Sequence, residues 1–135
     1  DEETQIIRFK QLLKIIDNNK EFSINDLGCG YGTLLEYMNK NSFFNFQYNG
    51  YDLSKKMIEY AKDIEVDNTN CKFSLIKHPD EIVLSDYTIA SGIFNVKMEH
   101  REFEWLSYIL ETIHEMNKKS SLDRGCFSAK AQSSL

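Results

Sequence analysis

Residues 23–33 read S-I-N-D-L-G-C-G-Y-G-T, and the rest of the chain is organised around this stretch. Ile24 and Leu27 can enter a sheet, and a helix-like run, L-L-E-Y-M, occupies residues 34–38. Glycines stand at every second position between them: Gly28, Gly30 and Gly32. Glycine adopts positive φ and leaves room for a ligand beside the backbone, and the first turn of a helix offers unpaired amides to an anion. This order of strand, glycine turn and helix indicates a nucleotide-binding βα unit.

A second motif, N-G-Y-D-L-S at residues 49–54, places a carboxylate 22 positions after Gly30. An acid about 20 residues past such a loop, at the end of the second strand, can accept hydrogen bonds from both ribose hydroxyls. The alternative is that Asp52 is only a turn or cap residue before the helix that starts near Ser54, which is the expected N-cap of that helix. The two motifs together favour the ribose interpretation.

Asp26, two residues before the first glycine, bears on which nucleotide this loop would hold. A pyrophosphate is disfavoured directly beside a carboxylate, and the spacing G-x-G-x-G departs from the dinucleotide pattern G-x-G-x-x-G. S-adenosylmethionine suits the loop better, because its carboxylate can use the amides of the turn. Its ammonium and sulfonium groups are favoured by a nearby negative charge.

At these residues the sequence resembles a known family. D-L-G-C-G-Y-G-T at residues 26–33 and G-Y-D-L-S-K-K-M-I-E-Y-A at residues 50–61 are similar to the first two motifs of class I S-adenosylmethionine-dependent methyltransferases. The resemblance is specific over residues 23–61 and looser through residue 117. It implies an enzyme that methylates a small-molecule or biosynthetic acceptor, with S-adenosylmethionine as cofactor and S-adenosylhomocysteine as product.

The remaining chain alternates predicted strands and helices. Helices are expected over residues 4–18, 34–41, 54–64 and 99–117, and strands over residues 23–27, 47–52, 71–76 and 87–92. This alternation predicts an α/β, Rossmann-like, doubly wound sheet, mainly parallel, with helices on both faces.

The last part of the chain carries a weaker pattern. Residues 123–128 resemble the start of a fifth strand, and residues 118–135 otherwise read as a poorly defined tail. The resembling family has a seven-stranded sheet, so we expect its C-terminal strands to be truncated or missing here. With no repeat or linker evident, residues 1–135 are expected to form a single S-adenosylmethionine-binding domain.

Ligands of such sheets bind beyond the carboxyl ends of the strands, where the strand order reverses. The resemblance implies that Asp52 holds the ribose, that Leu53 and Met57 border the adenine, and that residues 91–94 follow the methionine half. The predicted cofactor-binding residues are Asp26, Leu27, Gly28, Cys29, Gly30, Gly32, Asp52, Leu53, Met57, Lys77, His78, Ser91, Gly92 and Phe94.

The end of the third strand departs from the family pattern. Many members place an acid there to meet the adenine amino group, whereas Lys77 and His78 stand at that place and Asp80 follows. Adenine would then be held by backbone groups and apolar contacts.

No catalytic residue is assigned from the sequence. Methyl transfer from a sulfonium mainly requires alignment, and a general base helps only where the acceptor must lose a proton. Histidines are the candidates that titrate near neutral pH: His78, His100 and His114. Of these, His114 is expected to be structural and His100 solvated. Cys29 is expected to pack inside the glycine turn rather than act as a nucleophile.

Composition narrows the partners. The 135 residues carry 16 basic and 21 acidic side chains, a net charge of −5, which argues against a nucleic-acid groove. No membrane span or signal peptide is evident, no metal site is predicted, and three widely spaced cysteines indicate a reduced, cytoplasmic protein. The chain begins at Asp1 without methionine. A small-molecule acceptor is expected, together with a homodimer formed through an open sheet edge.

Two other function classes stay open at this point. One is a module that binds S-adenosylmethionine without turnover, or serves as a subunit of a complex. The other is an NAD-dependent oxidoreductase, against which Asp26 and the glycine spacing argue.

Overall fold

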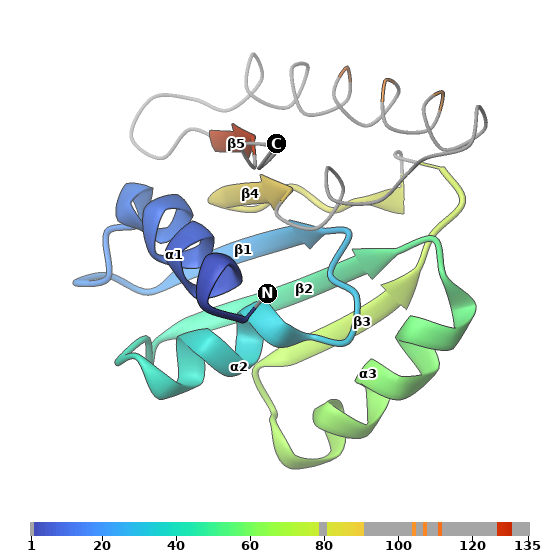
Figure 1. Ribbon diagram of the computed structural model, residues 1–135, viewed down its shortest axis with the longest axis horizontal. Coiled ribbons are helices and arrows are strands. Elements are labelled where there is room, and N and C mark those ends of the chain that lie inside the picture. Colours follow the sequence, from blue (N-terminus) through green and yellow to red (C-terminus); the bar gives the residue numbers. More distant parts are fainter. Residues whose placement is uncertain are drawn as a thin grey trace.

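A parallel five-stranded sheet with the order β3-β2-β1-β4-β5 forms the centre of the molecule (Figure 1). The computed structural model describes residues 2–78 and 81–90, the backbone of 127–130, and the single positions Glu104, Ser107 and Glu111. The strands are β1 (Phe22–Leu27), β2 (Phe46–Asp52), β3 (Cys71–Leu75), β4 (Tyr87–Ala90) and β5 (Phe127–Lys130). The predicted α/β class and parallel sheet are confirmed, and strand order reverses between β1 and β4.

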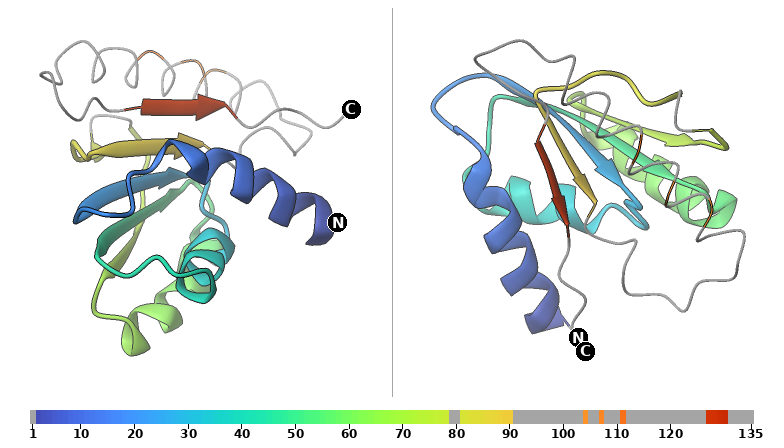
Figure 2. Two further views of the ribbon diagram at one scale, coloured as in Figure 1. Left: turned by 90° about the vertical axis from the view of Figure 1, so that its left-hand side faces the viewer. Right: turned by 90° about the horizontal axis from the view of Figure 1, so that it is seen from above.

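Three described helices lie on one face of this sheet (Figure 2). They are α1 (Glu2–Leu12), which continues into the 3₁₀ turn η1 (Leu13–Ile15), α2 (Thr33–Lys40) and α3 (Lys55–Asp67). The crossovers through α2 and α3 both move outward from β1, so their common right-handedness places both helices on the same side. Within the described part of the chain, no helix is long and apolar enough to cross a membrane.

Apolar side chains from the strands and these helices form the main core. Its most deeply buried members are Ile24, Leu34, Leu35, Met38, Tyr48, Ala61, Phe73 and Ile89. Full burial of a large apolar side chain contributes about 1.5–3 kcal/mol. This core therefore fixes how α2 and α3 lie against β1, β2 and β3.

The opposite face of β1 and β2 is more polar, because successive side chains of a strand point to alternate faces. Residues 81–86 are hydrogen-bonded to this face through Ser23 and Asn25. The helix expected over residues 99–117 falls mostly outside the described residues. Glu104, Ser107 and Glu111 are helical and exposed, and their spacing puts them on one side of a helix.

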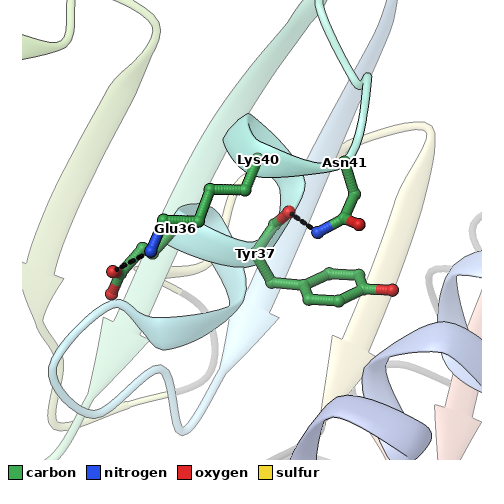
Figure 3. A network of polar contacts seen from close by, with 4 residues as sticks. All are labelled: Glu36, Tyr37, Lys40 and Asn41. Carbon is green, nitrogen blue, oxygen red and sulfur yellow. Dashed lines mark hydrogen bonds and ion pairs between the residues drawn. The ribbon is translucent and has the colours of Figure 1, made fainter.

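The helix ends follow the expected capping chemistry. Ser54 caps α3 as predicted, since its Oγ accepts the amide of Met57 at 3.3 Å. At the far end of α2, Lys40 pairs with Glu36 at 2.9 Å, and Asn41 Nδ2 donates to the carbonyl of Tyr37 at 2.8 Å (Figure 3). Both charged side chains of the pair are exposed, so the pair adds little stability.

Candidate cofactor-binding site

The glycine loop joins β1 to α2 at the carboxyl end of the sheet. Three glycines have φ in the left-handed region: Gly28 at 74°, Gly30 at 56° and Gly32 at 85°. The amides of Gly28 and Cys29 both donate to the carbonyl of Tyr51, at 2.8 and 3.1 Å. The loop is thus attached to the end of β2, in a backbone conformation that residues other than glycine rarely adopt.

Gly30 and Gly32 serve different purposes in this loop. A Cβ on Gly32 would lie 2.8 Å from Ile64 Cδ1 and 3.0 Å from Phe73, so this glycine allows close packing of the core. Among the described residues, a Cβ on Gly30 would meet only Met57 Sδ, at 3.7 Å. The space beside the Gly30 backbone is therefore open enough for a ligand atom.

Asp52 is half-buried at the end of β2 and connects two backbone segments. Its Oδ2 accepts the amide of Gly30 at 2.9 Å, and its Oδ1 accepts the amide of Ser54 at 2.9 Å. The bond to Ser54 is a turn interaction, the role that the sequence offered for Asp52 as the alternative to ribose binding. Because an ionised carboxylate can accept about four hydrogen bonds, the same group can still accept ribose hydroxyls.

Asp26 lies on the core side of the loop and is only 1% exposed. Its Oδ2 accepts the hydroxyl of Tyr48 at 2.6 Å. Burial, with the nearby Asp26 carboxylate, raises the pKa of Tyr48 well above its ordinary value, so the hydroxyl stays protonated and donates. The Asp26 carboxylate therefore lies on the buried side of the loop, and its charge acts on the loop residue Cys29.

Cys29 packs inside the loop, with its Sγ 3.7 Å from the carbonyl of Gly30. Burial, assisted by the charges of Asp26 and Asp52, raises the pKa of the Cys29 thiol far above neutral. A cysteine nucleophile must be a thiolate, so the geometry agrees with the packing role expected from the sequence.

The loop after β3 begins beside Asp52, because the amide of Ile76 donates to the Asp52 carbonyl at 3.1 Å. Lys77 and His78 follow and are exposed. Their amides both donate to Glu81 Oε2, each at 2.8 Å. These bonds, from His78 first and then Lys77, lower the pKa of the Glu81 carboxyl.

Several predicted residues come together around the glycine loop, and others lie outside the described residues. Met57 lies beside Gly30. Leu53 follows Asp52 directly and is exposed, whereas Leu27 is fully buried in β1. Predicted residues outside the described part of the chain are Ser91, Gly92 and Phe94, together with the histidines His100 and His114.

Sequence reasoning missed two residues of this region, Tyr48 and Glu81. Tyr48 stands between the polar residues Gln47 and Asn49 in β2, an alternation that predicts burial but not a bond to Asp26. Glu81 follows the proline at position 79, which indicates a turn but not that this carboxylate accepts the amides of Lys77 and His78.

Comparison with known proteins places the chain in a family. A family model described as "Methyltransferase domain" matches residues 24–120. The "Putative methyltransferase Rv1506c" of Mycobacterium tuberculosis is 37% identical over 108 residues, which cover 80% of this chain and 63% of that protein. The chain therefore spans less than two thirds of the length of this curated relative.

Solved structures show the same fold at low sequence identity. Mycolic acid cyclopropane synthase CmaA1, complexed with SAH and CTAB, matches with a TM-score of 0.60 and 17% identity, over 82% of this chain and 39% of that one. The plantazolicin methyltransferase BamL matches with a TM-score of 0.58 and 21% identity, over 82% of this chain and 43% of that one. Since its motifs, its fold and the family model agree, the chain belongs to the class I S-adenosylmethionine-dependent methyltransferases.

Proposed function

We propose that this chain binds S-adenosylmethionine through its glycine loop and Asp52, and transfers the methyl group to a small-molecule or biosynthetic acceptor. The observation that carries the proposal is the bond from the Gly30 amide to Asp52 Oδ2 at 2.9 Å. It sets a carboxylate beside a stretch of backbone where an added Cβ would meet, within the described part of the chain, only Met57, at 3.7 Å. The ribose hydroxyls would donate to the carboxylate, and the part of the cofactor next to the ribose would lie along the open backbone.

Each part of the loop has a proposed role toward the cofactor. The first-turn amides of α2 at residues 33–35 lack intrahelical partners and can hold the cofactor carboxylate. Asp52 accepts the ribose hydroxyls, while Leu53 and Met57 border the adenine. The buried charge of Asp26 favours the cationic part of the ligand over a pyrophosphate.

When bound, S-adenosylmethionine supplies a methyl group on a sulfonium, which is already activated for displacement. The contribution of the chain is therefore to hold and align the reactants. Of the histidines considered as bases, only His78 lies in the described part of the chain. We assign it no proton transfer, because the contact that fixes it is made by its backbone amide.

Calorimetry tests the proposal directly, with S-adenosylhomocysteine and NAD as the two probes. We expect the wild-type chain to bind the first and not the second. Asp52→Ala should weaken binding by about 1–3 kcal/mol, the usual cost of leaving polar partners unpaired, and Asp52→Asn should do less harm. Asp63→Ala, which removes an exposed acid of α3, is the matched control. Unchanged affinity in Asp52→Ala, or preferential binding of NAD, would contradict the proposal.

Pairing of two copies through a sheet edge stays a prediction, and the two outer strands differ in how well they could support it. Among the described strands, β3 and β5 each have one neighbour. At β3, the amide of Phe73 already donates to Glu65 of α3. We therefore expect pairing, where it occurs, to use β5. Analytical ultracentrifugation of the purified chain over a range of concentrations would measure the pairing.

A further inference from the structure

Val83 is held through both of its backbone groups by side chains of the sheet. Its amide donates to the hydroxyl of Tyr51 at 3.3 Å, and its carbonyl accepts from Asn25 Nδ2 at 2.6 Å. Backbone groups of a folded chain need partners, and these side chains replace the neighbouring strand that would otherwise supply them. The segment before β4 is therefore fastened to β1 and β2 without being part of the sheet.

The bonds around Asn25 make this attachment specific. Asn25 is fully buried, and its Oδ1 accepts from Ser85 Oγ at 2.9 Å and from Asn49 Nδ2 at 3.3 Å. Burying polar groups is costly unless they are hydrogen-bonded, and a satisfied buried network favours one arrangement over others. A shift of residues 83–85 by one position would break the bonds of Val83 to Tyr51 and Asn25 and the bond of Ser85 to Asn25.

The same segment also binds the loop after β3. Glu81 lies two residues before Val83, and its carboxylate accepts the amides of Lys77 and His78. That loop starts at Ile76, whose amide is bound to the carbonyl of Asp52. A continuous series of contacts thus leads from Tyr51 through the strap, residues 81–85, to the backbone beside Asp52.

We propose that Tyr51 and Asn25 are positioning residues, which set the loop of Lys77 and His78 so that it selects the base of the cofactor. This inference rests on the proposed function. Because β3 is the outer neighbour of β2, a base whose ribose is held at Asp52 extends toward the end of β3. It meets Lys77 and His78 only where the strap places them.

The test compares Tyr51→Phe with Tyr87→Phe in the whole chain. Both tyrosines are buried, and each hydroxyl accepts one backbone amide, from Val83 at 3.3 Å and from Asp17 at 3.0 Å. Tyr87 therefore serves as a matched control at the opposite end of the sheet from the loop. The probes are S-adenosylhomocysteine and S-inosylhomocysteine, which differ only in the base, and amide hydrogen exchange reports on the strap.

We expect Tyr51→Phe to accelerate exchange at Val83, Lys77 and His78, and to lower the affinity ratio of the two probes about three- to tenfold, the scale of one lost hydrogen bond. Tyr87→Phe should change neither quantity. An unchanged ratio in Tyr51→Phe, with wild-type binding intact, would overturn this inference alone. Failure of the wild-type chain to bind S-adenosylhomocysteine would instead overturn the proposed function.

Discussion

Two loops leave the carboxyl end of the sheet on either side of Asp52, and they are held by different means. The loop at residues 28–32 is shaped by left-handed glycines and by amides bound to the carbonyl of Tyr51. The loop that starts at Ile76 is held at Lys77 and His78 by the carboxylate of Glu81 and, through Val83, by side chains of two strands. The first loop depends on backbone geometry, whereas the second depends on side chains distant in sequence.

The largest expected effect separates the two glycine roles within the first loop. Gly32→Ala should destabilise the fold by about 2–5 kcal/mol, since left-handed strain of about 1–2 kcal/mol adds to overpacking of about 1–3 kcal/mol against Ile64 and Phe73. Gly30→Ala carries the strain without the overpacking, so its loss of stability should be smaller while its loss of cofactor affinity is larger.

Urea unfolding and calorimetry with S-adenosylhomocysteine measure the two quantities separately. Gly50→Ala is a useful companion variant, because a Cβ there would also meet Phe73, at 2.7 Å, outside the loop. Equal stability of the Gly30 and Gly32 variants would show that packing does not distinguish the two positions.

The contrast between the loops also explains what the sequence could predict. The glycine loop was readable because its requirements are local: three glycines, a preceding strand and a following helix within residues 23–38. The parallel sheet and the Ser54 cap followed from patterns of the same short range. The strap was not readable, since the bond from Asn25 to Val83 joins residues 58 positions apart. No spacing rule reports such a contact.

The fifth strand shows the same limit. Residues 123–128 resembled the start of a strand, and the structure has β5 at Phe127–Lys130, parallel to β4. A run of four residues carries too few alternating side chains to locate its own ends. Its bounds are set by pairing with Tyr87–Ala90, which the local sequence does not reveal.

A smaller effect should come from the buried hydroxyl beneath the first loop. Tyr48→Phe removes the donor to Asp26 Oδ2 and leaves a buried carboxylate with one partner fewer. We expect a loss of about 1–3 kcal/mol of stability, measured by urea unfolding, with the exposed Tyr60→Phe as control. No change in stability would mean that backbone geometry alone maintains the first loop, and the contrast with the second loop would sharpen.

The second loop should respond to a surface change that leaves the first loop untouched. Glu81→Ala removes the shared acceptor of the Lys77 and His78 amides, so their hydrogen exchange should accelerate. Glu81→Gln retains an acceptor oxygen and should restore much of the protection. The amides of Gly28 and Cys29 bind a backbone carbonyl and should exchange at the wild-type rate in both variants. Equal acceleration in the two loops would contradict their independence.

The smallest effect is a dependence on pH that only the second loop should show. The pKa of Glu81 is lowered from its ordinary value of 4.5 by bonds from His78 and Lys77. A lowered folded-state pKa means that the carboxylate stabilises the loop fully above pH 4.5 and loses this effect as pH falls through the lower value.

The Lys77 amide chemical shift should therefore stay constant from pH 7 to about 4.5 and move only below it. The measurement is made in a His78→Gln background, which removes the imidazole and keeps the backbone amide that donates to Glu81. The Gly28 amide, bound to the Tyr51 carbonyl, lacks a titrating acceptor and serves as the internal reference. A Lys77 shift that moves near neutral pH, or that follows Gly28 throughout, would show that Glu81 does not hold the loop.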